Sequence, residues 1–192
     1  MTILNTLVAS VLSLVFLQAN AQTEIPKGFQ KGTITLADNS NLPGFVKDNI
    51  RKDASIVFIQ QAGEKKKTYN GSELVAAEID DAKFLCISGD FFKVLCQGNL
   101  CFLQKSSDAS GKPTYNGNEA TFSSGTEGKL NDYFIYNGKD KQLKLVSKKN
   151  ADEVIAASFA GNTAAIEKAR SANGDIAQLK EAVQVYNNGT NK

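Results

Sequence analysis

The sequence contains no histidine among its 192 residues. Without histidine there is no Ser-His or Cys-His pair to activate a nucleophile, and the commonest general base near neutral pH is missing. The usual nitrogen ligands for zinc and copper are missing for the same reason. These absences argue against many hydrolases and metalloenzymes, although paired carboxylates and Ser-Lys pairs are still available. We expect no cofactor and no metal site.

Arginine is nearly absent as well, because Arg51 and Arg170 are the only two. The guanidinium fork that binds phosphate in a bidentate manner is therefore scarce. The formal net charge is only +2, and the lysines are dispersed along the chain. The run Lys65–Lys67 follows Ala62-Gly63-Glu64 at a predicted hairpin, where lysines solvate a turn or protect an edge strand. We therefore expect no nucleic-acid partner.

The N-terminal segment has the features of an export signal. An apolar run from Leu7 to Leu17 precedes Ala19-Asn20-Ala21, which fits a signal-peptidase site. The run is too short for a bilayer span of about 20 residues, and Gln22 offers no lipid attachment site. We expect residues 1–21 to be removed and the protein to be periplasmic or secreted, with no transmembrane segment afterwards.

The remaining residues, 22–192, are expected to form one domain. A chain of that length can bury an adequate core without disulfides or metal. Residues 22–147 show short apolar runs separated by turn signals, and residues 148–187 show helical periodicity. Strands followed by helices predict an α+β fold, with an antiparallel, curled sheet of hairpins and about three C-terminal helices. The predicted strands are 31–36, 42–47, 55–60, 67–69, 74–79, three strands within 83–105, 132–136 and 142–146.

The segment 83–105 contains two glycine-first turn dipeptides, Gly89-Asp90 and Gly98-Asn99. Dipeptides of this kind suit two-residue type II′ hairpin loops, which fix the strand register. The first loop predicts Leu85 opposite Val94, and the second predicts Cys96 opposite Cys101. Alternation then places both of these cysteines on one apolar face, expected to be core, and points Cys86 to the other, mixed face. The residues of the apolar face are Leu85, Ile87, Phe92, Val94, Cys96, Cys101 and Leu103.

The three cysteines allow three interpretations. A disulfide between Cys96 and Cys101 fits the register, since opposed Cα atoms lie about 4.5 Å apart in a non-hydrogen-bonded pair. Cys86 is then a free thiol. Free core thiols are the second interpretation. A redox function is the third, but C-x4-C in strands differs from the exposed C-x-x-C at a helix start that redox proteins use. A metal site would need two further ligands.

Acidic residues give weaker signals. Asp80-Asp81 is the densest pair, but adjacent residues near a strand end point apart. The stretch Asp38–Asn41 resembles the start of a calcium loop, but it lacks the central glycine, and Asn49 stands where a bidentate glutamate is required. An Asx-rich turn is the favoured interpretation there. We assign no catalytic residue.

The segment 106–128 is rich in Ser, Gly, Asn and Thr, and we expect a long connection around a short strand at 120–122. Loops of this length are often functional, so a binding surface would be sought here first, but a flexible excursion is the favoured interpretation. The C-terminal part predicts helices with caps at Asn150 and Asp175. An apolar stripe on the last helix must be buried against the sheet or the other helices. Its residues are Ile176, Leu179, Val183 and Tyr186.

The export signal, the opening GTITLADNSNLPGFVK, the hairpin FFKVLCQGNLCFLQK and the closing VQVYN together resemble a group of small uncharacterised secreted proteins of Bacteroidetes-type Gram-negative bacteria. The resemblance implies an exported α+β domain and carries no activity with it. From the sequence we expect a non-enzymatic domain that binds a protein or a small ligand in the cell envelope or outside the cell. The alternatives are a carboxylate-dependent hydrolase of the glycosidase type and a thiol redox protein.

Overall fold

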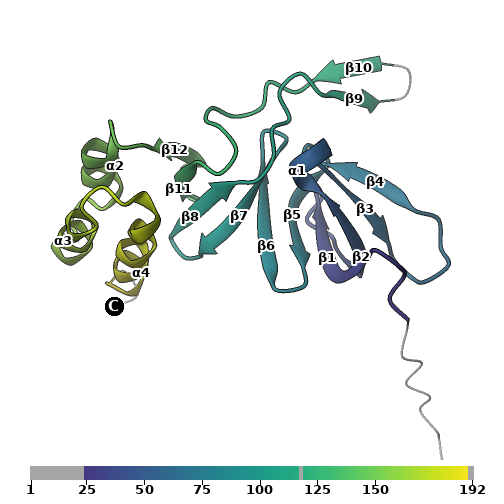
Figure 1. Cartoon of the computed structure of the whole chain (residues 1–192), viewed down its shortest axis with the longest axis horizontal. Helices are drawn as coiled ribbons and strands as arrows, with labels where there is room; N and C mark the ends of the chain where they lie inside the picture. The colour runs from purple at the N-terminus through teal and green to yellow at the C-terminus, as the bar shows by residue number, and fades with distance from the viewer. Residues whose placement is uncertain (1–23, 117–118, 190–192) are drawn as a thin grey trace, which may run out of the picture.

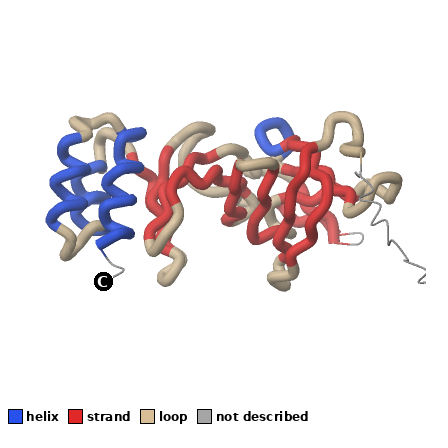
Figure 2. The backbone as a smooth tube through the Cα atoms, turned by 90° about the horizontal axis from the view of Figure 1, so that it is seen from below, coloured by secondary structure: helices blue, strands red, loops and turns tan. Residues whose placement is uncertain are grey.

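The computed structural model describes residues 24–116 and 119–189, and the predicted signal segment 1–21 lies outside this range. The described chain forms a large open antiparallel sheet followed by helices, as the sequence predicts. Figure 1 shows an elongated molecule, with the C-terminal helices at one end and the first strands at the other. The same arrangement is seen from below in Figure 2.

Ten strands make the main sheet, in the spatial order β12-β11-β8-β7-β6-β5-β1-β2-β3-β4. Nearly all neighbours are joined by hairpins, so the sheet is almost a simple meander. In chain order the strands are β1 (Gln30–Leu36), β2 (Asn41–Asn49), β3 (Ser55–Ile59), β4 (Lys67–Asn70), β5 (Leu74–Ile79), β6 (Ala82–Ile87), β7 (Asp90–Cys96), β8 (Leu100–Lys105), β11 (Tyr133–Asn137) and β12 (Gln142–Val146).

The helices cover one face of the sheet, which we call the inner face. They are α2 (Ala151–Ser158), α3 (Thr163–Ser171), a short 3-10 turn, η1 (Ile176–Gln178), and α4 (Leu179–Gly189). Their apolar side chains share a core with Phe102 of β8 and Ile135 of β11, both almost fully buried. The predicted stripe on the last helix is confirmed, since all four of its members belong to this core. Burial of this stripe holds the helical end against the sheet.

A second core lies on the inner face at the other end of the sheet. There the strands β1 to β7 surround Ile34, Ile56, Phe84 and Phe91, and the short helix α1 (Ile50–Asp53) contributes Ile50. The sequence analysis expected this face to be mixed. Lys93 is indeed exposed on it, but its apolar residues are buried, because the helices cover one end and the curled strands enclose the other.

The first predicted hairpin register is wrong. The β6–β7 turn consists of Ser88 and Gly89, which have φ angles of 50° and 87°, and Ile87 lies opposite Asp90. Two successive positive φ angles define a type I′ turn instead of type II′. As a result Leu85 lies opposite Phe92, two residues away from the predicted Val94. A shift by an even number of residues keeps every side chain on its predicted face.

The second predicted register is correct at Val94, which faces Leu103, and fails beyond it. A bulge after Val94 places Cys96 opposite Phe102. The extra residue rotates Cys96 to the inner face, beside the helical core, while Cys101 stays on the opposite, outer face. All three cysteines are free in the structure. No bridge between Cys96 and Cys101 is seen, and the register that supported the prediction of one does not occur.

An amide side chain of α4 accounts for this local geometry. Asn187 accepts a hydrogen bond from the backbone N–H of Leu100 at 3.0 Å and donates one to the carbonyl of the same residue at 2.9 Å. Its Nδ2 also lies 3.8 Å from Cys96 Sγ. A Cβ at Gly98 would come within 2.3 Å of the Asn187 side chain, so glycine is required there. Asn187 thus pairs with the first residue of β8 as another strand would.

One of the two predicted helix caps is confirmed. Asp175 accepts hydrogen bonds from Ala177 N and Gln178 Nε2, as the sequence predicts. Asn150 makes no side-chain cap to α2. Its amide is already bound to the Ser147 backbone N–H and the Leu145 carbonyl, at 2.7 and 2.9 Å, so the capping box is not formed.

Candidate functional site

The long polar segment between β8 and β11 contains a two-stranded ribbon that sequence reasoning reduced to one short strand. Strands β9 (Pro113–Asn116) and β10 (Glu119–Phe122) pair only with each other and form a sheet of their own. Figure 1 shows this ribbon standing off from the main sheet above α1. An isolated two-stranded hairpin is only marginally stable in water. The position of the ribbon therefore depends on how its root is held.

Four hydrogen bonds fix the root. Backbone bonds of 3.0 and 3.1 Å join Gly111 N to Ser123 O and Ser123 N to Lys112 O. Lys112 Nζ donates to the Lys52 carbonyl of α1 at 3.0 Å, and Ser123 Oγ donates to the Ser88 carbonyl at 3.1 Å. The root is thus attached both to α1 and to the β6–β7 turn. Gly89 permits this approach, because a Cβ there would lie 2.7 Å from Ser123 Oγ.

A buried ion pair lies beneath the root. Lys105 Nζ of β8 is 3.1 Å from Asp90 Oδ2 of β7, and the two side chains are 1% and 0% exposed. Burying two charges costs several kcal/mol per ion in general, so such a pair persists only when hydrogen bonds satisfy the remaining donors and acceptors. Among the described residues, no buried side-chain nitrogen or oxygen lacks a partner.

The other partners of this pair belong to the loops on both sides of the ribbon. Asp90 accepts from Ala109 N at 2.7 Å, before the ribbon, and from the N–H and hydroxyl of Thr126, each at 2.7 Å, after it. Lys105 Nζ donates to the carbonyls of Thr126, Glu127 and Gly128 at 2.7, 3.3 and 3.3 Å. One ion pair therefore holds both ends of the connection to the outer face of the sheet.

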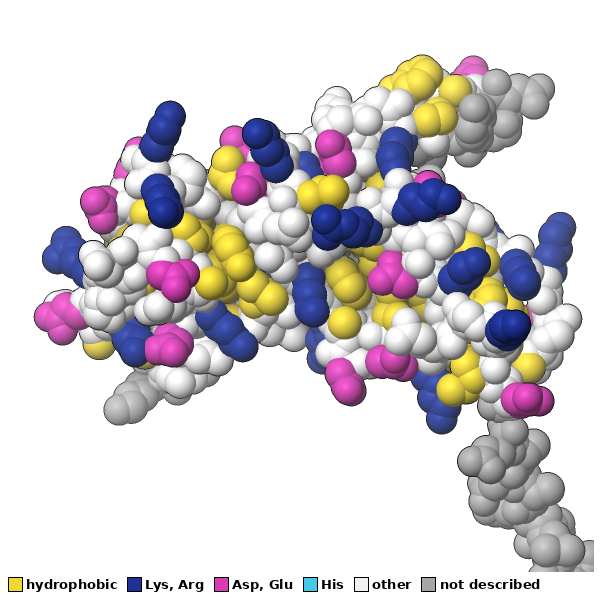
Figure 3. Space-filling model, viewed as in Figure 1, with side chains coloured by type: hydrophobic (Ala, Val, Ile, Leu, Met, Phe, Trp, Pro, Cys, Tyr) yellow, Lys and Arg dark blue, Asp and Glu magenta, His cyan; other side chains and the backbone are white. Residues whose placement is uncertain are grey.

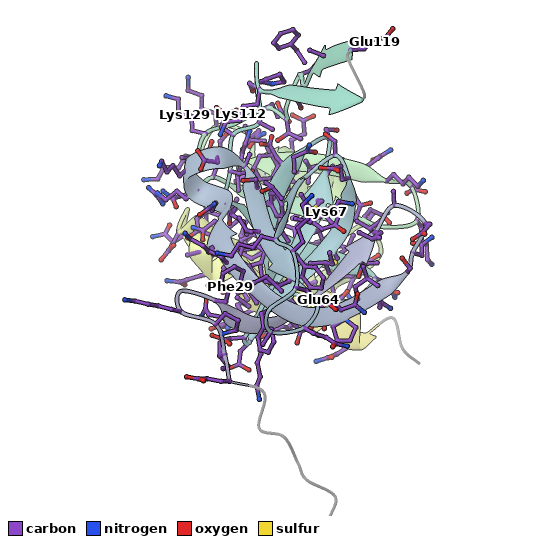
Figure 4. The ribbon with its side chains drawn as sticks, turned by 90° about the vertical axis from the view of Figure 1, so that its right-hand side faces the viewer. Phe29, Glu64, Lys67, Lys112, Glu119 and Lys129 are labelled. Atoms are coloured by element: carbon purple, nitrogen blue, oxygen red, sulfur yellow. The ribbon has the colours of Figure 1, made fainter. Side chains whose placement is uncertain are left out.

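The described side chains of the ribbon add nothing to the core. Its residues with described side chains, Pro113, Glu119, Ala120 and Phe122, are all exposed. Phe122 is 69% exposed, the highest value of any large hydrophobic side chain in the described residues. Figure 3 shows hydrophobic surface on this ribbon, and both hydrophobic surface and charges of both signs over the rest of the visible face. Figure 4 places Glu119 at the far end and Lys112 and Lys129 near the root.

The cysteines do not form a reactive site. Burial raises the pKa of Cys86 to about 12. Burial also raises the pKa of Cys96, against a smaller lowering by the hydrogen bond from Asn187. A reactive cysteine needs a lowered pKa, so these environments oppose thiol redox chemistry.

The predicted acidic stretches are turns. Asp38 accepts from the backbone N–H and hydroxyl of Ser40 at 2.8 and 2.6 Å, and the bond from the hydroxyl is the main cause that lowers the pKa of its carboxyl. Asp80 and Asp81 form the two-residue β5–β6 turn, where Asp80 has a φ of 49°. In the described ranges, no three His, Cys, Asp or Glu side chains gather as a metal site would require.

One cavity brings two carboxylates together, at the helical end of the molecule. Asp152 and Asp175 both line this hollow of about 350 Å³. Asp175 is already engaged as the cap of η1. A glycosidase needs one carboxyl as acid and a second as base or nucleophile. The second group is committed to local structure here, so the geometry does not favour the hydrolase.

No protein-family model, curated protein or solved structure matches this chain. The resemblance to secreted proteins of Bacteroidetes-type bacteria therefore rests on its motifs alone. Within the described residues, no helix is long and apolar enough to cross a membrane.

Proposed function

We propose that the protein is an exported, non-enzymatic binding domain that engages a protein partner through the β9–β10 ribbon. One observation carries the proposal: a fully buried ion pair fixes the root of a ribbon whose described side chains are all solvent-exposed. Buried ion pairs are costly and are rarely retained for stability alone. Here the pair sets the position of an element whose described side chains support no core.

The chemistry of the ribbon favours a protein partner with an apolar pocket. Exposed aromatic side chains commonly provide most of the binding energy where they insert into a pocket on the partner. Phe122 has this character, and its strand is held at a fixed place by its pairing with β9. A preorganised element loses less conformational entropy when it binds.

Excision of the ribbon tests this function. Lys112 and Ser123 are hydrogen-bonded neighbours at the root, so Asn-Gly in place of residues 113–122 closes the chain with a two-residue turn. We expect the variant to keep the circular dichroism spectrum and unfolding midpoint of the parent, and to lose the partner that co-purifies with the parent from its natural source. Retention of that partner by the excised variant would refute the proposal. Phe122→Ser provides the same comparison with the backbone intact.

Export is the second part of the proposal and is tested separately. It is supported by the apolar run and the small-x-small site before residue 22. The intact mass of the protein isolated from its natural source is expected to correspond to a chain that begins at Gln22. A cytoplasmic protein that retains residues 1–21 would contradict export. This result would not decide the ribbon proposal, which the excision experiment tests.

A further inference from the structure

The outer face of the sheet carries a hollow that is separate from the ribbon. It has a volume of about 390 Å³ and lies over β1, β5 and β6. This volume is within the range of about 300–1,000 Å³ that is typical of ligand pockets. Thr33 and Thr35 line it from β1, Ala76 from β5 and Leu85 from β6, and Asn41 and Gln97 also belong to its lining.

The strand register explains why the sheet is hollow there. Asn41 lies opposite Thr35, Thr35 opposite Ala76, and Ala76 opposite Leu85. These four residues form one row across four strands, and their side chains point to the same face. Alanine has the shortest side chain of the four, so the row is lowest at its centre and rises on both sides. The apolar floor is therefore flanked by groups that form hydrogen bonds.

The polar groups around this floor are neutral or compensated. Thr35 Oγ1 donates to Asn41 Oδ1 at 2.7 Å, which orients the amide and leaves its N–H₂ group as a donor. Glu78 and Lys83, the only charged residues of the lining, lie 3.8 Å apart and offset each other. An anionic ligand would meet Glu78, and a cationic ligand would meet Lys83. The site therefore suits a neutral ligand.

We propose that this hollow binds a neutral oligosaccharide. Sugar hydroxyls both donate and accept hydrogen bonds, which matches the mixed donors and acceptors of Thr33, Asn41 and Gln97. The C–H face of a pyranose ring suits the small apolar floor of Ala76 and Leu85. Among the residues that the structure describes, no aromatic side chain projects into the hollow to stack on the ring, since Phe84 in its lining is buried in the inner-face core. The dissociation constant is therefore expected in the millimolar range.

Titration of the ¹⁵N-labelled protein tests the assignment. The neutral probes are cellopentaose, maltopentaose and chitopentaose, and pentagalacturonate is an acidic oligosaccharide of the same length for comparison. At least one neutral probe is expected to shift the amide resonances of Thr35, Ala76 and Leu85, and pentagalacturonate is expected to shift them less. The proposal is overturned if none of the three neutral probes shifts these amides, or if the acidic probe shifts them equally.

Two variants on the same strand make the result specific. Ala76→Leu fills the floor of the hollow from a half-buried position on the outer face, so the fold is expected to tolerate it. It should raise the dissociation constant of the neutral probe at least tenfold. Val75→Leu adds one methylene group at an exposed neighbour outside the hollow, and should leave binding unchanged. Equal binding by Ala76→Leu and the parent would place the ligand elsewhere and overturn the proposal.

Discussion

Asp90 and Lys105 form an ion pair of 3.1 Å on neighbouring strands, with both side chains almost completely removed from solvent. Between them they bind backbone groups before and after the β9–β10 ribbon. The pair therefore connects the sheet to an element that projects from it. The contribution of this pair to the unfolding free energy and its role in positioning the ribbon can be measured separately.

Removal of one partner of this pair is expected to be severe. Asp90→Asn leaves the Lys105 ammonium buried without a counter-ion, which in general costs about 3–5 kcal/mol of unfolding free energy. Lys105→Met is expected to cost a comparable amount, and the double variant less than the sum of the two. Urea unfolding of the four proteins measures the coupling. The exposed pair Glu78–Lys83, with side chains 48% and 56% exposed, is the control, and its coupling should be below about 1 kcal/mol. Additive effects at Asp90 and Lys105 would contradict the assigned coupling.

The link between α4 and the sheet gives a second prediction. Asn187→Ala leaves the buried N–H and carbonyl of Leu100 without their side-chain partner. An unsatisfied buried polar group costs about 1–3 kcal/mol, so the unfolding free energy should fall by at least that amount. Asn188→Ala removes the same atoms at the neighbouring exposed position and should change stability little. Equal effects of the two substitutions would show that the Asn187 bonds do not hold the helix.

The state of the cysteines gives a third prediction. Alkylation of the denatured, unreduced protein should add three labels, because Cys86, Cys96 and Cys101 are all free. In the folded protein Cys86 should stay unlabelled at pH 8, since a thiol with a pKa of about 12 is almost entirely protonated there. Intact mass spectrometry counts the labels. A form with a single label would indicate a disulfide and contradict the observed strand register.

Asp108 gives a prediction about pH near the ribbon root. The hydrogen bond from the Ser110 side chain is the main cause that lowers the pKa of the Asp108 carboxyl below the ordinary value of 3.8. A lowered folded-state pKa contributes stability that is present above 3.8 and is lost as the pH falls through the folded value. The amide resonance of Ser110 should therefore titrate with a midpoint below 3.8, and Asp108→Asn should remove this transition. A midpoint above 3.8 would contradict the assigned bond.

The strands and the helical stripe could be predicted because their signals are local. Alternation along β6 to β8 gave the correct face for most residues, even where the β6–β7 turn was placed one residue too late. The predicted pairing of Cys96 with Cys101 failed because it depends on a distant partner. Cys96 leaves its predicted face because of a bulge beside Asn187, a residue 91 positions away in the sequence. No local pattern in LCQGNLC encodes that contact.

The loop of the candidate site could be predicted from local composition, but the ion pair that holds it could not. Low complexity and length marked the segment 106–128 as a possible binding surface. The ion pair beneath it was not predicted, because Asp90 was assigned to a turn and Lys105 was only the last residue of the predicted strand segment 83–105. A single lysine that ends an apolar strand carries no signal of burial. The register of β7 against β8 places Phe92 opposite Lys105, and only this pairing brings the Lys105 ammonium close to the Asp90 carboxylate.

The central claim is that the ribbon contacts a partner, and photo-crosslinking from Phe122 tests it most directly. A photoreactive phenylalanine analogue is placed at position 122, and at Val75 in a matched control, since both side chains are exposed at 69% and 39%. The protein is expressed in its natural host and irradiated. We predict one discrete crosslinked species from position 122 and none from position 75. No adduct at position 122, or the same adducts from both positions, would contradict the account.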